Sequence, residues 1–241
     1  MECALLNRYG LLAVTGPDAR AFLHAQLTND IEHLPAERSI FAGWCTAKGR
    51  LLATMRVIPS AEGFLLQLAR DLAPAVAKRL SMFILRSKVK ISDESARPQM
   101  GVWNVDWQGP DVSWNGADVK VRVAPQRFLM IGPGVSGTCA AGEDAWALEE
   151  IRAGRPLITA ATQDMFVPQM VNLEKIGGVD FQKGCYPGQE IVARAQYRGE
   201  VKRRMVRLPA PAGAALKPGE AFNGGIVVDA AGGELLAVLP V

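Results

Sequence analysis

The densest group of reactive side chains surrounds Cys185. Segment 180–194 reads DFQKGCYPGQEIVAR and supplies a thiol, an amine, carboxylates and two glycines. Pro187 predicts a short helix over 187–195, which would place Cys185 at a helix N-terminus, where unpaired amides and the helix dipole favour an anion. Lys183 adds a positive charge two residues away. Both features favour a reactive thiolate over a buried, inert cysteine, so Cys185 and Lys183 are the predicted catalytic residues.

Histidine chemistry and metal chemistry have less support. His24 and His33 are nine residues apart and would lie on different faces of a helix, so His24 is interpreted as a packing or surface residue. No C-x-x-C pair occurs, which argues against a zinc site or a self-held iron-sulfur cluster, and no metal site is expected. We expect four reduced thiols in a reducing compartment, and these are Cys3, Cys45, Cys139 and Cys185.

A glycine-rich segment over 132–137, GPGVSG, matches the G-x-G-x-x-G pattern of dinucleotide-binding loops. Pro133 removes one backbone donor from this loop, and no second parallel strand follows it. The segment is therefore interpreted as a plain glycine-rich turn.

A basic stripe follows the Cys185 segment. Six cations occur within fourteen residues, offset only by Glu200, and Tyr197 lies among them. A solvated charged face is one interpretation, and contact with phosphate in RNA or in an anionic cofactor tail is the other. The six cations are Arg194, Arg198, Lys202, Arg203, Arg204 and Arg207.

The elements that must position these groups belong to the α+β class, because runs of strands are separated from the helices. Period-two patterns over 41–69 predict an antiparallel meander, and Asn115-Gly116 predicts a tight hairpin. Segment 155–184 has no regular pattern. The other expected elements are a strand at 11–15, helices from 18, over 71–83 and over 145–153, strands at 89–92, 100–107 and 127–131, and an all-β tail with strands near 226–228 and 235–238.

Composition fits an ordinary globular protein. The 241 residues are 49% hydrophobic and 21% charged, with a formal net charge of +3. No apolar run approaches the length that spans a bilayer, and the first residues lack a targeting pattern. We expect a cytoplasmic protein without membrane contact.

Residues 183–190, KGCYPGQE, resemble the K-G-C-[FY]-x-G-Q-E signature of the YgfZ family of folate-binding proteins, a branch of the glycine-cleavage T-protein superfamily. The resemblance runs from about residue 9 to residue 207 and includes segments 15–30, 47–50 and 146–154. The motif residues taken from it are Gly184, Tyr186, Gly188, Gln189 and Glu190, with Arg194 downstream.

The resemblance implies a T-protein-like arrangement of small α+β units round a central folate cleft. Residues 1–40 and 112–200 would form a discontinuous folate-binding core, and 41–111 an inserted antiparallel sheet with a helix. Residues 201–241 would form a short C-terminal β-barrel-like unit, although this tail is shorter than the family's terminal barrel.

The resemblance also implies tetrahydrofolate, or another reduced folate, as the cofactor. Tyr9 and Trp146 would present aromatic rings to the pterin, and Gln169 and Asn172 would hydrogen-bond its edge. The implied function is support of iron-sulfur cluster assembly or repair in client enzymes, including radical enzymes that modify tRNA. Partners would be folate, those enzymes or assembly proteins, and tRNA through Arg198, Lys202, Arg203 and Arg204.

Two rival functions stay open. The first is folate-dependent aminomethyl transfer, for which T-proteins carry an Asp in the strand that follows the first hairpin. Residues 49–54 read GRLLAT and contain no carboxylate, so the nearest replacements are Asp164 and Glu174. The second rival is an RNA-binding accessory protein that uses the basic stripe.

Overall fold

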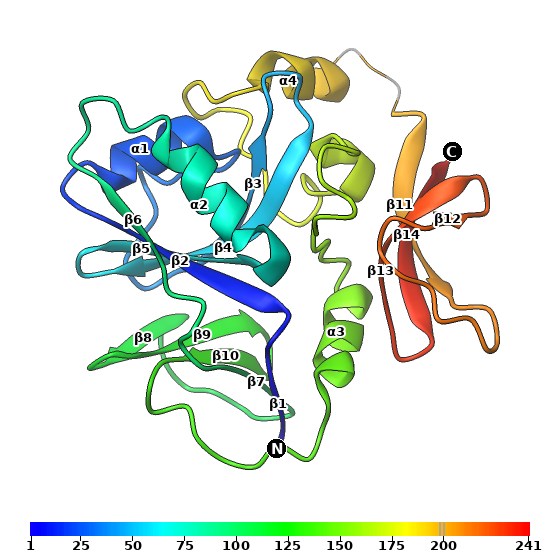
Figure 1. Ribbon diagram of the computed structural model, residues 1–241, viewed down its shortest axis with the longest axis horizontal. Helices are drawn as coiled ribbons and strands as arrows, with labels where there is room; N and C mark the ends of the chain where they lie inside the picture. Colours follow the sequence, from blue (N-terminus) through cyan, green and yellow to red (C-terminus); the bar gives the residue numbers. More distant parts are fainter. Residues whose placement is uncertain (198, 200) are drawn as a thin grey trace. The chain divides into compact units, whose positions relative to one another are not determined.

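The computed structural model describes residues 1–197, 199 and 201–241 and has the predicted mixed α+β class (Figure 1). Its contacts divide the chain into two compact units. Unit 1 comprises Met1–Phe22, Glu32–Ile40 and Arg56–Trp146, and unit 2 comprises Leu23–Ile31, Phe41–Met55 and Ala147–Val241. The division predicted from the resemblance, with breaks at 41, 112 and 201, stays a prediction.

One sheet of unit 1 has five antiparallel strands. Along β9, Val119, Val121 and Val123 are buried while the intervening residues are less so, which is the alternation of a half-buried strand. The hairpin predicted at Asn115-Gly116 joins β8 to β9 and is confirmed. The strand order is β1 (Glu2–Leu5), β7 (Gln99–Trp103), β10 (Arg127–Ile131), β9 (Asp118–Ala124) and β8 (Val112–Asn115).

Unit 1 also holds β2 (Tyr9–Thr15), which pairs with β5 (Gly63–Ala69) on one side and β6 (Lys90–Asp93) on the other. Residues 56–60 of β4 (Leu51–Ser60) pair with β5. These strands confirm the meander predicted between residues 41 and 69.

The helix predicted over 71–83 forms as a short 3-10 turn, η1 (Arg70–Leu72), followed by α2 (Ala73–Ser81). Leu72, Val76 and Leu80 are buried as their spacing predicted. The prediction for Phe83 was wrong: the helix ends at Ser81, so Phe83 leaves the buried face and is 43% exposed.

Unit 2 contains β3 (Ile40–Cys45) from residue 41 onward, and β3 is hydrogen-bonded to β4. Segment 155–184 is irregular as predicted and contains one 3-10 turn, η2 (Pro168–Val171). The C-terminal strands form a curled half-barrel sheet, which confirms the predicted barrel-like unit. Their order is β11 (Arg203–Pro209), β14 (Glu234–Pro240), β13 (Gly225–Ala231) and β12 (Ala221–Phe222).

The chain passes from one unit to the other within two helices. These are α1 (Ala19–Gln26), which is divided after Phe22, and α3 (Glu143–Arg152), which is divided after Trp146. They confirm the helices predicted from 18 and over 145–153. Among the described residues, no helix combines the length and the apolarity needed to cross a membrane.

The prediction of four reduced thiols was wrong for two of them. Cys3 on β1 and Cys139 before α3 form a disulfide, with 5.1 Å between their Cα atoms. Their pairing depends on the register of β1 against β7 and on the path of the 132–142 loop. The 136-residue separation between the two cysteines carries no local signal of this contact.

Candidate functional site

The loop that carries Cys185 is hydrogen-bonded at both ends. At its start, Asp180 Oδ1 accepts the backbone N–H of Lys183 at 3.1 Å. At its end, Gln189 Nε2 donates to the carbonyl oxygens of Lys183 and Gly184 at 3.3 and 3.4 Å. Cys185 lies between these ties with an exposed thiol. The loop therefore presents the sulfur to solvent from a fixed backbone.

The predicted start of the following helix was wrong by two residues. Helix α4 (Gln189–Tyr197) begins at Gln189, because Gly188 has φ +81°, outside the helical region. Cys185 consequently lies four residues before the first helical residue. The helix N-terminus is therefore no reason to expect a reactive thiol at Cys185. Two features that favour reactivity remain, and these are the exposure of the thiol and the positive charge of Lys183.

Two glycines let this loop cross the hairpin between β3 and β4. A Cβ at Gly188 would lie 2.6 Å from the backbone nitrogen of Gly49, and a Cβ at Gly49 would lie 2.9 Å from Cβ of Ile191. Both glycines have positive φ, +81° and +71°. Two backbone segments can approach this closely only where neither residue carries a side chain. Gly188 of the motif therefore allows the Cys185 loop to pack against segment 46–50.

Lys183 joins the loop to the end of α1. Its ammonium donates to the carbonyl oxygen of His24 and, at 2.7 Å, to that of Leu27. A cation at these carbonyls satisfies helix-end acceptors and complements the helix dipole. Burial lowers the pKa of Lys183 to about 8, while the negative charges of Asp30, Asp180 and Cys185 oppose this shift. Burial also raises the pKa of Tyr186, whose ring centroid lies 5.0 Å from the ammonium.

His24 is the residue that sequence reasoning undervalued. Its Nδ1 lies 3.1 Å from Asp30 Oδ1, and a Cβ at Gly184 would lie 3.3 Å from its Nε2. The imidazole is thus oriented by a carboxylate and faces the residue next to Cys185. The sequence held no signal for this, because the contact depends on how the 180–189 loop returns to α1. The loop thus carries an exposed thiol and a buried ammonium and contacts an oriented imidazole, which are groups that nucleophilic thiol chemistry uses.

The two aromatic residues predicted to contact folate lie in unit 1 and are buried. Tyr9 is 7% exposed and Trp146 is 3% exposed. The Trp146 ring has the Arg127 guanidinium 4.5 Å from its centroid and contacts Trp103 at a centroid distance of 6.0 Å. This packing accounts for Trp146 without a ligand, so its contact with folate stays a prediction, as does that of Tyr9.

The two predicted amide residues lie in unit 2, at η2. Gln169 Nε2 donates to Val192 O and Asn172 Nδ2 donates to Met205 O, each at 2.7 Å. Asn172 has φ +55°, a conformation that asparagine tolerates better than most residues. Gln169 Oε1 is buried and has no hydrogen-bond partner among the described residues. Contact of these amides with a pterin stays a prediction.

The structure divides the basic stripe into different environments. Arg204 forms an ion pair with Glu174 and donates to Gln169 O at 2.9 Å, so its charge serves the packing of η2 on β11. Arg207 Nε lies 3.5 Å from Glu234 Oε2. Arg194, Lys202 and Arg203 are exposed. Arg198 and Glu200 lie outside the described residues.

The glycine-rich loop at 132–137 contacts the carboxylate of Asp118. Gly134 N donates to Asp118 Oδ1 at 2.8 Å, and a Cβ at Gly132 would overlap with Asp118. An acidic side chain at these glycines is consistent with a plain turn. It also disfavours a bound phosphate by charge repulsion.

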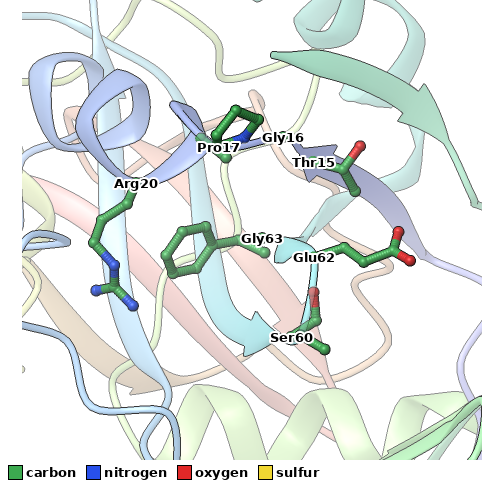
Figure 2. Close-up of a pocket in the computed structure, with 10 residues that line it drawn as sticks. Thr15, Gly16, Pro17, Arg20, Ser60, Glu62 and Gly63 are labelled. Carbon is green, nitrogen blue, oxygen red and sulfur yellow. The ribbon is translucent and has the colours of Figure 1, made fainter. Parts of the chain in front are cut away.

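A separate cavity of about 580 Å³ lies in unit 1, between the β2–α1 turn and the β4–β5 hairpin. Figure 2 shows the hydroxyls of Thr15 and Ser60 and the Glu62 carboxylate on one side, with Arg20 on the other. Arg20 lies over the Phe64 ring, 5.1 Å from its centroid. None of the residues predicted for the folate site or the Cys185 site lines this cavity.

The fold is that of the glycine-cleavage T-proteins. A crystal structure of glycine cleavage system aminomethyltransferase T from Bartonella henselae superposes with a TM-score of 0.75, over 99% of this chain and 78% of that chain, at 17% identity. No protein-family model matches the chain.

Curated relatives then give the family. The chain is 31% identical over 238 residues to the tRNA-modifying protein YgfZ of Serratia proteamaculans (strain 568), covering 86% of this chain and 71% of that protein. It is 31% identical over 227 residues to the tRNA-modifying protein YgfZ of Vibrio vulnificus (strain YJ016), covering 86% and 70%. The chain belongs to the YgfZ family, which confirms the resemblance seen around KGCYPGQE.

Proposed function

We propose that this protein binds a reduced folate, tetrahydrofolate, and supports the assembly or repair of iron-sulfur clusters in client enzymes through Cys185. The observation that carries the proposal is the Cys185 loop. Its thiol is exposed, its backbone is tied at both ends, and the Lys183 ammonium interacts electrostatically with Cys185. Because relatives are named tRNA-modifying proteins, we place the clients among the enzymes of tRNA modification.

The chemistry of unit 2 fits a pterin. Two buried acceptors, Gln169 Oε1 and Glu174 Oε2, have no hydrogen-bond partner among the described residues. A pterin edge carries N–H donors that would satisfy such acceptors, which otherwise cost free energy. Bound tetrahydrofolate would supply amine nitrogens that carry one-carbon units. Gln169 and Asn172 would orient its edge.

The residues around Cys185 would position its thiol and assist its reaction. Lys183, whose ammonium interacts electrostatically with Cys185, would stabilise negative charge that develops on a group reacting at the sulfur. Asp30 would hold His24 with Nε2 toward the loop, where that nitrogen could accept the proton of the thiol as Cys185 reacts. Gly188 and Gln189 would keep the loop in place during the reaction.

Titration calorimetry with tetrahydrofolate tests the first half of the proposal. We expect saturable binding to the full chain and much weaker binding of NADH and NADPH, because Asp118 lies at the glycine-rich loop. Gln169→Leu, which removes the partnerless acceptor, should weaken folate binding. Tight nicotinamide binding with no response to folate would overturn the assignment.

Replacing Cys185 by Ser tests the second half. The variant should fold and bind folate as the wild type does, since the thiol is exposed, but it should fail to restore iron-sulfur enzyme activity in cells that lack the protein. Lys217→Met, a change at another exposed position of unit 2, is the matched control and should restore activity. Full activity with Cys185→Ser would remove the thiol from the function.

A further inference from the structure

Four sulfur atoms gather on one face of the five-stranded sheet of unit 1. Cys3 on β1 is in register with Val102 on β7, and Met100 on β7 is in register with Met130 on β10. Cys139 reaches the same face from the loop before α3 and bonds to Cys3. Its Sγ lies 3.5 Å from Sδ of Met100, and Met130 packs in the same cluster.

The surroundings of these sulfurs are apolar. Val102 and Val135 are buried beside them, and Val105 packs at the edge. In the described part of the chain, no group of three or more His, Cys, Asp or Glu side chains could hold a metal ion. The cluster therefore offers thiol and thioether sulfur among apolar side chains. Soft, monovalent metal ions prefer such ligands, whereas hard divalent ions do not.

We propose that Cys3, Cys139 and Met100 form a copper(I) site when the disulfide is reduced. Reduction needs two molecules of a small thiol, which transfer two electrons to the Cys3–Cys139 bond and leave as their own disulfide. Each cysteine then loses its proton as its thiolate binds the ion, and the Met100 thioether donates a lone pair without losing one. Met130 is the additional thioether within the cluster.

The site would be gated by oxidation state. While the disulfide is intact, the two sulfur atoms are bonded to each other, so neither cysteine can bind a metal as a thiolate. Both are half-buried, which leaves a route for transfer of the ion from a soluble carrier, while Met100 is 9% exposed and fixed by the sheet. Copper(I) would therefore bind only under conditions that also keep the protein reduced.

The test is an anaerobic titration of the reduced full chain with copper(I), against the chromophoric chelator bathocuproine disulfonate. We expect one tightly held equivalent. Met100→Leu keeps the apolar volume but removes the thioether, and it should weaken binding by at least about tenfold, as loss of a metal's supporting groups generally does. Cys139→Ser should abolish the tight site, and the disulfide form should show none.

Cys185→Ser is the matched control, because it removes a thiol outside the cluster, and it should bind as the wild type does. X-ray absorption at the copper edge should show sulfur neighbours alone. The proposal is overturned if Met100→Leu binds as tightly as the wild type, if Cys139→Ser retains the tight site, or if Cys185→Ser loses it. Circular dichroism of each variant separates a lost site from a lost fold.

Discussion

Cys185 and Cys45 have opposite environments, although both are free thiols. Cys185 is exposed, whereas burial raises the pKa of Cys45 to about 12. Since the thiolate is the nucleophile, iodoacetamide near neutral pH should modify Cys185 far faster than Cys45. Mass spectrometry of peptides from a timed reaction measures both rates. If Cys185 were the slower of the two, the loop would be a packing element instead of a reactive one.

Lys183 contributes to stability through the carbonyl oxygens of His24 and Leu27. Replacing it by Met keeps the apolar stem but removes both hydrogen bonds, so the free energy of unfolding should fall by about 2 kcal/mol. Lys202→Met, at an exposed position, should change it by less than about 0.5 kcal/mol. Urea denaturation of the two variants makes the comparison, and equal stabilities would contradict the capping role.

The same lysine predicts a dependence on pH. Its pKa is about 8 in the folded protein and 10.5 in its ordinary state, so the unfolded chain binds more protons between these values. Its contribution to the free energy of unfolding should therefore rise as pH increases from 8 to 10.5. The difference between wild-type and Lys183→Met unfolding curves over this range isolates the effect. A difference that is flat or falls with pH would mean that burial does not lower the pKa of Lys183 in the folded protein.

The loop crossing at Gly188 and Gly49 predicts a large effect of a single methyl group. Gly188→Ala combines a positive φ with overlap against the hairpin backbone, so it should cost about 2–4 kcal/mol. Gly177→Ala is matched in φ, at +71°, but a Cβ there meets nothing within 4 Å. It should cost about 1 kcal/mol. Thermal unfolding of both variants shows whether overlap or backbone strain dominates.

On strand β11, neighbouring cations of the basic stripe have different contacts. Arg204→Ala would leave Glu174 largely buried without its ion pair and should destabilise the protein by about 3 kcal/mol. Arg203→Ala, at the exposed neighbouring position, should have little effect on stability. Chemical denaturation measures both. Similar losses would mean that the Arg204–Glu174 pair does not hold η2 on the strand.

Contact of tRNA with Lys202 and Arg203 stays a prediction. If these side chains bind phosphate, reversing both charges should reduce the slope of log affinity against log salt by about one unit per lost contact. Unchanged slopes would leave the stripe as a solvated face.

For the protein as a whole, we expect no aminomethyl transfer. In β4 the candidate polar residue, Thr54, is fully buried and donates its hydroxyl to Pro156 O at 2.8 Å. Glu174 is paired with Arg204, and only Asp164, whose N–H donates to Leu51 O at 2.8 Å, lies beside the strand with an exposed side chain. Strand β4 itself therefore supplies no carboxylate to orient the amine and accept its proton, and Asp164 is the one replacement of the three that is left.

The assay combines the protein with aminomethylated lipoyl carrier protein and tetrahydrofolate, and follows ammonia and methylenetetrahydrofolate. Turnover comparable to that of an authentic T-protein would favour the transferase function. Loss of such turnover in Asp164→Asn would then identify the missing carboxylate.

Much of the fold follows from local patterns in the sequence. The spacing of Leu72, Val76 and Leu80 predicts a helix with one buried face, and Asn115-Gly116 predicts its hairpin. The run KGCYPGQE, together with segments such as 15–30 and 146–154, resembles the YgfZ family, and the comparisons confirm the family and the T-protein fold. These inferences succeed because helix periodicity, turn geometry and a contiguous motif each depend on residues that are neighbours in the chain.

Only the tertiary structure decided which distant groups meet. The Cys3–Cys139 bond, the capping of α1 by Lys183, and the approach of His24 to Gly184 each join residues more than 130 positions apart. Such contacts depend on strand register and on where loops return, and no local spacing encodes either. The sequence by itself determined the elements, the family and the loop for which we propose reactivity, and folding in three dimensions determined the partners of Cys3, His24 and Lys183.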